Sequence, residues 1–459
     1  MNTLKYLNII KFFCTKRSGA HPYVMLNVYK ALIKSRITYG AIATLKETNN
    51  QEIYQLVQVV KNAALRAILG YTKSTPITTM LAEAAEYPIK YDLERAAARF
   101  IIAKLSQNHD NQNYLEKIPH GSHLMTIFNS IKNTAMVKAA SSVPNNLKMF
   151  DSIEGSHQKN VTPNIILKKS SLETISKFEN YFMIYTDGSL DEDSRGIGIY
   201  FNDTKEMYSR RIMAEVSICT VELIAILMAL KIGILMGKRK IVVLTDSKSA
   251  VVSLKRNNNN KYFSTQIHNL IHKNPEKDFV IQWIPSHVGV PGNESADAAA
   301  KNGLTSTEIL DIPIPKGDNY KIIDRKIFER WKNEFKERTR IKGKFYGDLM
   351  NQQPSNVPWF KHKGLDTGKI KLFNRIRSNH TYAKNFLNLM NVIDDETCDA
   401  CNEIENAEHI IFKCKKFTSE RQRHNFSKKY KNYIEMCRDT SSSNISDIAE
   451  YLKEIKKDI

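Results

Sequence analysis

Residues 181–189 read YFMIYTDGS, a short apolar run that ends at Asp187 and Gly188. A second run, residues 241–246, reads IVVLTD and ends at Asp246. Short apolar runs rich in β-branched and aromatic residues predict buried strands. Ligand sites in open α/β sheets lie beyond the carboxyl ends of the strands. We therefore expect both aspartates to emerge at the same edge of one sheet.

The segments around these two runs alternate between strand and helix patterns. Three hairpin-linked strands come first, followed by a helix, a strand, a second helix and a last strand. The expected ranges are 181–186, 196–201 and 207–213 for the first strands, 221–236 for the helix, 241–243 for the fourth strand, a helix from Lys248, and 279–284 for the fifth strand. This order predicts an α/β fold with a mixed five-stranded sheet and flanking helices.

Two further acids can reach the same edge. Glu222 lies in the first turn of the predicted helix 221–236, and a right-handed crossover would return it to the two aspartates. Asp297 ends the segment 286–297, SHVGVPGNESAD, which also carries His287. Gathered carboxylates raise one another's pKa values unless cations neutralise them, and hard oxygen ligands select Mg²⁺ or Mn²⁺. The pattern therefore predicts two ions suited to in-line phosphodiester displacement.

Each acid by itself also has an ordinary structural explanation. Glu222 suits the positive end of a helix dipole, Asp246 could cap the next helix, and Asp187 could serve a turn. The functional interpretation therefore depends on their combination.

That combination resembles a type 1 ribonuclease H domain over residues 181–303. The similarity runs through Thr186 to Ser189, Glu222-Leu223, Thr245 to Ser247, and His287 to Asp297, in that order. The resemblance implies that Asp187, Glu222, Asp246 and Asp297 bind two Mg²⁺ or Mn²⁺ ions and that His287 assists proton transfer or product release. It also implies an RNA–DNA hybrid as substrate, read through the 2′-hydroxyls of its minor groove.

Two features depart from the family pattern. No separate basic handle follows the helix after the fourth strand, because Leu254-Lys255-Arg256 continues into four asparagines. Ser217, Ile218 and Cys219, just before Glu222, lack the asparagine common there. Both departures concern the grip on the substrate.

A second constellation reads Cys398-x2-Cys401-x7-His409-x4-Cys414. Three thiols and an imidazole within seventeen residues suit a closed tetrahedral structural Zn²⁺ site. The alternative is a group of reduced cysteines beside a surface histidine. Basic residues flank the motif, which favours contact with nucleic acid: Lys413, Lys415, Lys416, Arg421 and Arg423.

The order of these parts resembles the carboxyl-terminal part of non-LTR retrotransposon polyproteins of the insect type. Residues 375–381, RIRSNHT, look like their connecting segment, and the helical pattern of residues 24–104 is similar to the region that follows their polymerase. We see no polymerase aspartate pair, so we expect no reverse transcriptase activity. The predicted regions are 1–105 helical, 106–176 linker, 177–303 ribonuclease H, 304–390 basic helical connector, 391–420 zinc-knuckle-like module and 421–459 basic helical tail.

Composition supports an anionic partner. The 459 residues carry 68 Lys and Arg against 48 Asp and Glu, a net charge of +20, which favours nucleic acid. Residues 321–344 hold ten basic and four acidic side chains and are a candidate phosphate contact.

The sequence also bears on the compartment. The six cysteines are sparse, which fits a reducing compartment, and lysines interrupt the apolar start of the chain, so we expect no secretory signal. The apolar segment 212–236 is broken by Glu215, Glu222 and Lys231 and is interpreted as a buried helix, not a membrane span. We expect an intracellular protein of the nucleus or cytoplasm, not secreted and without a membrane partner.

Three hypotheses follow. The leading one is an endoribonuclease that cuts the RNA strand of RNA–DNA hybrids by two-metal-ion catalysis. The second is a nucleic-acid-binding protein of retroelement origin whose inherited site is idle, motivated by the charge and the two departures. The third is a truncated element without a selected role. The sequence leaves the oligomeric state open.

Overall fold

The computed structural model describes residues 3–14, 19–41, 45, 51–107, 122–131, 133–136, 143–156, 161–256, 262–457 and 459. The chain divides into two compact units. One, here the helical unit, comprises Met1–Ala97, Gly121–Leu124 and Arg325–Ile459. The other, here the sheet unit, comprises Ala98–His120 and Met125–Asp324. The sheet unit is therefore inserted into the helical unit along the sequence.

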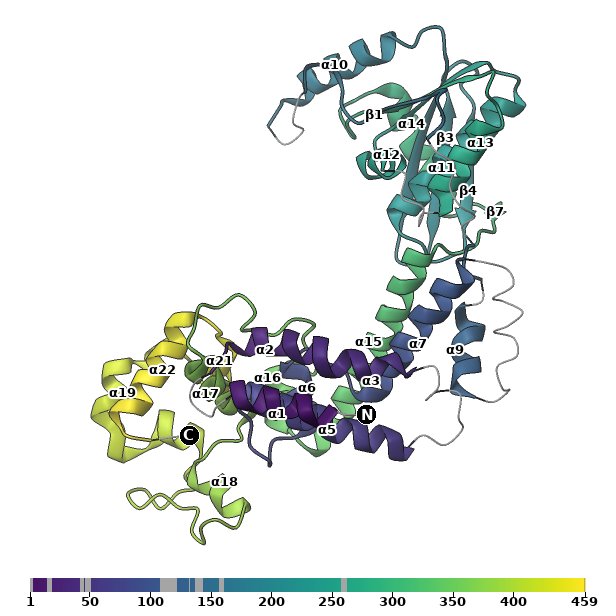
Figure 1. The fold of residues 1–459 in the computed structure, drawn as a ribbon. Coiled ribbons are helices and arrows are strands. Elements are labelled where there is room, and N and C mark those ends of the chain that lie inside the picture. Colours follow the sequence, from purple (N-terminus) through teal and green to yellow (C-terminus); the bar gives the residue numbers. More distant parts are fainter. Residues whose placement is uncertain are drawn as a thin grey trace. The chain divides into compact units, whose positions relative to one another are not determined.

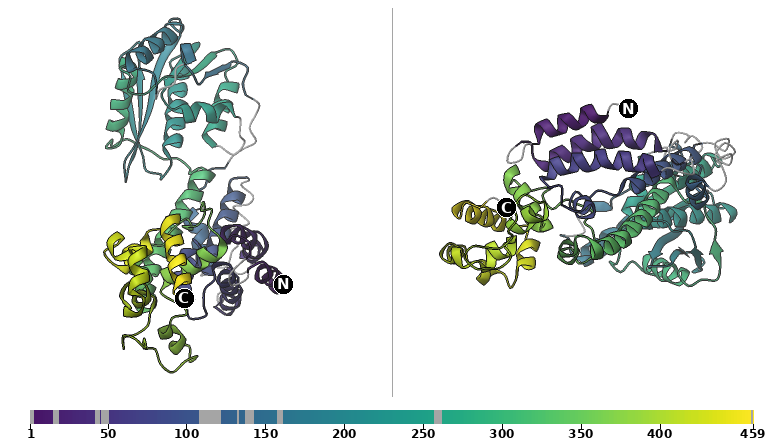
Figure 2. Two further views of the ribbon diagram at one scale, coloured as in Figure 1. Left: turned by 90° about the vertical axis from the view of Figure 1, so that its left-hand side faces the viewer. Right: turned by 90° about the horizontal axis from the view of Figure 1, so that it is seen from below.

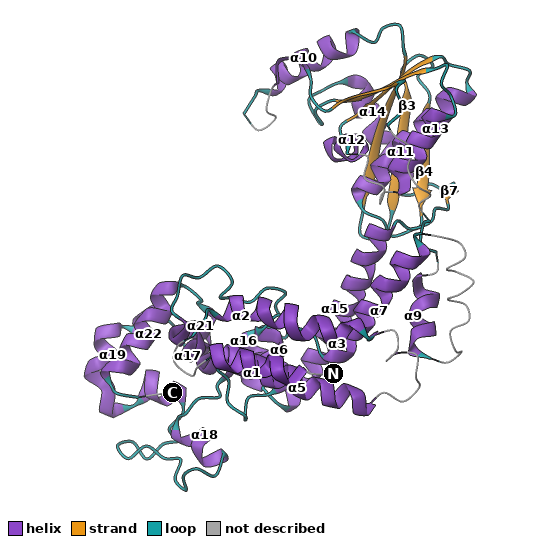
Figure 3. Ribbon diagram, viewed as in Figure 1, coloured by secondary structure: helices purple, strands orange, loops and turns teal. Residues whose placement is uncertain are grey.

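All the strands of the described chain belong to the sheet unit, as the orange arrows of Figure 3 show. Its elements, in chain order, are α7 (Ile89–Leu105, shared with the helical unit), α9 (His123–Ile131), β1 (Leu147–Phe150), α10 (Asn164–Ser176), β2 (Phe182–Leu190), β3 (Arg195–Phe201), β4 (Met207–Ile212), α11 (Ile218–Leu235), β5 (Lys240–Thr245), α12 (Lys248–Lys255), α13 (Tyr262–His272), β6 (Asp278–Trp283), α14 (Pro291–Gly303), β7 (Ile309–Leu310) and α15 (Lys316–Ile341, shared). The predicted α/β fold class is confirmed.

The sheet has seven strands in the order β1-β6-β5-β2-β3-β4-β7. The five predicted strands form its centre, with β2 antiparallel to β3 and parallel to β5. Two short strands that the sequence did not predict extend it: β1 pairs in parallel with β6, and β7 pairs in parallel with β4. Residues 106–176, expected as a linker, thus contain α9, β1 and α10.

Helices cover both faces of this sheet (Figure 1). On β3, Ile197 and Ile199 are fully buried, whereas Gly196 and Gly198, which alternate with them, face α14. A Cβ atom on Gly198 would lie 2.2 Å from the backbone oxygen of Ala296. Alternate residues of a strand point to opposite faces, so the two glycines let α14 lie directly on the backbone of β3. Their place in the strand is explained by this contact.

Helix α11 packs against β2, β3, β5 and α13. Among the described residues it is the one helix long and apolar enough to span a membrane, with 61% of that window buried inside the protein. Its buried side chains, which include Val221, Leu230 and Ala229, belong to the core of the sheet unit.

The helical unit combines the first and last parts of the chain, and Figure 2 shows its amino-terminal helices α1, α2 and α5 side by side. Its elements are α1 (Thr3–Phe13), α2 (Pro22–Tyr29), the π-helical η1 (Lys30–Lys34), α3 (Ser35–Tyr39), α5 (Gln51–Leu69), α6 (Ile77–Glu83), α16 (Lys344–Leu349), α17 (Thr367–Ser378), α18 (Lys384–Leu389), the π-helical η3 (His409–Lys413), the 3₁₀ turn η4 (Lys415–Phe417), α19 (Thr418–His424), α20 (Phe426–Lys429), α21 (Tyr433–Arg438) and α22 (Ser442–Glu454), with parts of α7 and α15.

A buried ion pair joins the two parts of this unit. Arg377 on α17 donates from Nε to Glu83 Oε1 on α6 over 2.6 Å, and it also donates from Nη1 to the backbone oxygen of Cys437 over 2.6 Å. Neither member of the pair is more than 5% exposed. Removing one partner of such a pair leaves an uncompensated buried charge, which costs about 3–5 kcal/mol. The pair therefore ties the amino-terminal helices to the carboxyl-terminal ones.

Candidate metal centres

Asp187 lies within β2, and Asp246 directly follows the neighbouring parallel strand β5, at the same end of the sheet. Thr186 of β2 is paired with Thr245 of β5, so the next residue along the chain after each is one of the two aspartates. Asp187 is buried and Asp246 is half-buried. The register of β2 and β5 therefore brings the two acids to one edge of the sheet, as expected.

Glu222 joins them from α11. One carboxylate oxygen from each of Asp187, Glu222 and Asp246 can be chosen so that all lie within 4.8 Å of one another. The sequence predicted Glu222 in the first turn of a helix that begins at Val221. The helix instead begins at Ile218, so Glu222 lies just beyond its first turn. A dipole interaction at the helix start is therefore a weaker explanation for this acid, because that effect fades beyond the first turn.

Gly188 makes this close approach possible. A Cβ atom there would lie 3.0 Å from Val221 Cγ1 and 3.2 Å from Glu222 Cδ. Burial raises the pKa values of both Asp187 and Glu222, and the backbone hydrogen bond from Gly188 to their carboxylates offsets part of that rise. The TDGS turn thus gives space and a hydrogen-bond donor to the cluster.

Burial and mutual repulsion dominate the electrostatics of the cluster. Burial, then the charges of Asp246 and Asp297, raise the pKa of Asp187 from 3.8 to about 7. Burial, then the charges of Asp187 and Asp246, raise the pKa of Glu222 well above its usual range. Glu222 Oε2 is buried and has no hydrogen-bond partner. Acids held this way repel one another, and a hard divalent cation is the partner that such oxygens accept.

Asp297 and His287 lie on the α14 side of the site. Asp297 accepts a 2.7 Å hydrogen bond from Lys301 Nζ, one turn further along α14. Its carboxylate, that of Glu294 and the imidazole of His287 form a second group within 4.8 Å. His287 is exposed and has a φ of 54° in its loop. Asp297 therefore acts on the three-acid cluster through its charge on Asp187, and its oxygen is not within that 4.8 Å group.

Three residues of the site were not assigned a role from the sequence. Asn293 is 2% exposed and donates from Nδ2 to Asp246 Oδ2 over 3.3 Å. Trp283 Nε1 donates to the backbone oxygen of Asp246 over 3.0 Å. Both contacts orient Asp246 from outside the cluster. Glu294 joins His287 and Asp297. Asn293 and Glu294 lie inside the segment 286–297. Their closeness in sequence to Asp297 was the signal that could have assigned them to the site.

Residues 179–305 match the family model of RNase H. The matched segment contains Asp187, Glu222, Asp246, Asp297 and His287. No curated protein matches the chain. The sheet unit therefore holds an RNase H domain, of a family of nucleic-acid hydrolases that bind RNA–DNA hybrids and use Mg²⁺. The three close carboxylates of this domain fit such ions, because a buried oxygen of Glu222 has no other partner.

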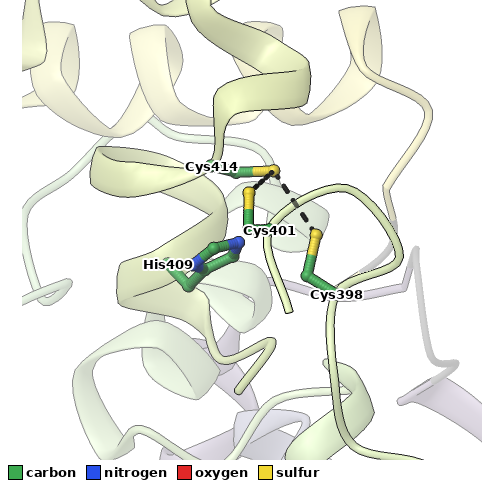
Figure 4. Close-up of side chains that lie close together, drawn as sticks. All are labelled: Cys398, Cys401, His409 and Cys414. Atoms are coloured by element: carbon green, nitrogen blue, oxygen red, sulfur yellow. Dashed lines mark hydrogen bonds between the residues drawn. The ribbon is translucent and has the colours of Figure 1, made fainter. Parts of the chain in front are cut away.

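Outside the RNase H domain, a second centre lies in the helical unit. One ligand atom from each of Cys398, Cys401, His409 and Cys414 lies within 4.8 Å of the others. Figure 4 shows the three thiols and the imidazole turned toward one another. Cys414 Sγ lies 3.7 Å from Cys398 Sγ and 3.9 Å from Cys401 Sγ. These sulfur separations are those of a tetrahedral Zn–S site, whose bonds are about 2.3 Å long.

The local fold orients each of these ligands. A tight turn joins the first two cysteines, because Cys401 and Asn402 both donate to the backbone oxygen of Cys398. His409 Nδ1 lies 3.2 Å from Glu403 Oε2, while its Nε2 is buried without a hydrogen-bond partner. A carboxylate on one ring nitrogen commonly fixes the other nitrogen for a metal. The free Nε2 therefore fits a Zn²⁺ ligand better than a surface histidine.

Proposed function

We propose that this chain is an endoribonuclease that hydrolyses the RNA strand of RNA–DNA hybrids with two divalent ions, Mg²⁺ or Mn²⁺. One observation carries the proposal: Asp187, Glu222 and Asp246 hold their oxygens within 4.8 Å of one another, inside the segment that matches RNase H. Asp297 would complete the ligand set from α14.

The roles follow from the chemistry of the site. When bound, the two ions would activate the attacking water and stabilise the leaving 3′ oxygen, as in other two-metal hydrolases. Asp187 and Glu222, both buried, would hold their oxygens fixed. Asn293 would keep the carboxylate of Asp246 in orientation. His287, exposed on its loop, would exchange a proton between the site and solvent.

Substrate selection would depend on backbone shape. The 2′-hydroxyl of RNA lies in a wide, shallow minor groove of the hybrid and distinguishes the RNA strand from DNA. Such contacts read no base sequence, so we expect cleavage at many positions.

The Cys398, Cys401, His409 and Cys414 cluster is proposed to hold one structural Zn²⁺. Its support is the free His409 Nε2 beside three thiols. The basic side chains that flank the cluster in the sequence would contact nucleic acid. Arg421 also donates from Nη2 to the Cys414 backbone oxygen over 2.7 Å, which ties α19 to the cluster.

The experiment incubates the full chain and Mg²⁺ with end-labelled RNA–DNA hybrid, duplex RNA and duplex DNA. The proposal expects cleavage of the RNA strand of the hybrid alone, and its loss in Asp187→Asn. Asp203→Asn is the matched control, because Asp203 is an exposed acid of the same domain. Equal cleavage by Asp187→Asn, or cutting of the DNA strand, would overturn the assignment.

The second candidate is a nucleic-acid-binding protein with an idle site. The net charge of +20 favours it as strongly as it favours the enzyme. Tight, salt-dependent binding of the hybrid without turnover in Mg²⁺ or Mn²⁺ would support this alternative.

A retroelement origin of the insect non-LTR type is part of the proposal, supported by the order of the RNase H domain and the distal Cys/His cluster. An intracellular, reducing location is also proposed, because the six cysteines are sparse along the 459 residues. Detection of the protein by fractionation of the cells that express it tests the location.

A further inference from the structure

The helical unit contains a row of three cavities along α5, here called the α5 groove. The first, of about 470 Å³, lies between α5, α6 and α15. The second, of about 420 Å³, shares Ile77, Thr78 and Arg338 with the first. The third, of about 600 Å³, shares Arg66 and Lys73 with the second. Since neighbouring cavities share side chains, they adjoin one another.

The second and third cavities are basic. Their charged lining residues are Arg66, Lys73, Arg338 and Lys342, and among the residues that the structure describes no carboxylate lines either cavity. Arg338 is paired with Glu334 over 2.7 Å. Within the described part of the chain, by contrast, no ion pair involves Arg66, Lys73 or Lys342. These three cations therefore have their charges available for an anion from solution.

Arg66 gives a second indication that these cavities bind an anion. It is only half-exposed, and its Nε atom is buried with no hydrogen-bond partner in the described protein. Burial lowers the pKa of this guanidinium. Leaving a buried donor unpaired is costly, so an acceptor from a ligand would satisfy it. A phosphate oxygen is the acceptor that guanidinium groups recognise best.

The first cavity has a different lining. Its apolar side chains are Val59, Ile77, Leu81, Pro88, Ile89 and Trp331. Its charged lining residues are Lys90, Glu334 and Arg338, and Glu334 is paired with both of the cations. Amides stand among them: Gln58 accepts from the backbone N–H of Ile89 over 2.9 Å and donates to Asn62 over 2.7 Å, which holds both in place. The amide of Gln55 is exposed. An apolar cavity with a few fixed amides suits a flat heterocycle whose edge forms hydrogen bonds.

We propose that the α5 groove binds single-stranded nucleic acid, with phosphates at Arg66, Lys73 and Lys342 and a base in the adjoining apolar cavity. A duplex keeps its bases stacked inside, whereas a single strand offers backbone and unstacked bases together. Phosphates and base edges are common to RNA and DNA, so we expect strands of both kinds to bind. This site is separate from the RNase H domain and does not depend on its activity.

The test measures binding of fluorescein-labelled single-stranded RNA and DNA to the full chain by anisotropy, with Mg²⁺ and Mn²⁺ left out so that no cleavage occurs and without a chelator, so that the proposed Zn²⁺ is kept. Arg66→Ala/Lys73→Ala/Lys342→Ala should weaken binding about tenfold or more at moderate salt, since one half-buried and two exposed charge contacts are removed. The slope of log K against log salt should fall by about 2, because each phosphate contact on a single strand contributes about 0.7. The double variant Lys73→Ala/Lys342→Ala changes only exposed residues and should reduce the slope by about 1.4.

The matched control is Lys428→Ala/Lys431→Ala/Lys453→Ala, which removes the same charge from exposed lysines of the same unit. Equal loss of affinity in both triple variants, or none in the groove variant, would overturn the site. A further pair tests the base cavity. Val59→Trp fills it, whereas Leu56→Trp, on the same helix and similarly exposed, does not line it.

Val59→Trp should therefore weaken single-strand binding several-fold, and Leu56→Trp should leave it unchanged. Equal affinities of these two variants, or tighter binding of a blunt duplex than of a single strand, would contradict the proposal. Hybrid cleavage by the groove variants should be retained on short substrates. If the RNase H assignment is wrong, the wild-type chain will not cleave the hybrid, but these binding results will still be as predicted.

Discussion

Replacing Asp187 by asparagine should stabilise the metal-free RNase H domain at alkaline pH. The pKa of Asp187 is raised from 3.8 to about 7 by burial and by the charges of Asp246 and Asp297. The folded state therefore keeps its proton up to about pH 7, while the unfolded state releases it near pH 3.8. The stabilisation that comes from protonated Asp187 is fully present below pH 3.8 and is lost as the pH rises through 7.

The size of the effect follows from the shift. About 3 pKa units correspond to about 4 kcal/mol at 1.36 kcal/mol per unit. Asp187 is only 8% exposed, so solvent screening reduces this little. We expect Asp187→Asn to gain up to about 4 kcal/mol over the wild type at pH 8 without metal, and little at pH 4.

Amide hydrogen exchange read by mass spectrometry resolves the domain within the full chain, because peptides from β2 and β5 report its opening free energy. The exchange rates are corrected for the intrinsic effect of pH. Asp203→Asn serves as the control and should change stability by less than about 0.5 kcal/mol. The reasoning would be refuted if Asp187→Asn and wild type had the same opening free energy at pH 8. It would also be refuted if the two proteins differed by the same amount at pH 4 and pH 8.

Three other predictions concern particular contacts. Gly188→Ala should weaken Mg²⁺ binding in calorimetry, because its Cβ presses on Glu222 and Val221, whereas Gly317→Ala, with nothing within 4 Å, should not. Cys414→Ser should remove the zinc found by elemental analysis of the purified chain, and Cys14→Ser should retain one ion; equal zinc content would argue against the ligand set. Glu83→Gln should destabilise the helical unit by about 3–5 kcal/mol in urea unfolding, as expected for a buried pair that loses one charge, and an unchanged midpoint would show that Arg377 needs no carboxylate.

The central sheet and its acids could be predicted from local patterns. The runs ending at Asp187 and Asp246 are short and apolar, and the parallel register of β2 and β5 then fixes where both acids emerge. The spacing of Cys398, Cys401, His409 and Cys414 likewise predicted a cluster, because all four lie close in sequence.

Other features depend on contacts distant in sequence. Strand β1 has only Leu147 fully buried and pairs with residues more than 100 positions away, so its local pattern is weak. The Glu83–Arg377 pair spans 294 residues. Helix α11 begins at Ile218, three residues before the predicted start, and the serine at its N-cap, Ser217, was the available signal. The α5 groove likewise combines residues of α5 and α15.

The most direct measurement is anomalous diffraction from crystals of the full chain grown with an RNA–DNA hybrid and Mn²⁺. The account predicts two peaks about 3.5–4 Å apart, bound by Asp187, Glu222, Asp246 and Asp297. Absence of any ion from this pocket, or one ion coordinated without Glu222, would contradict it.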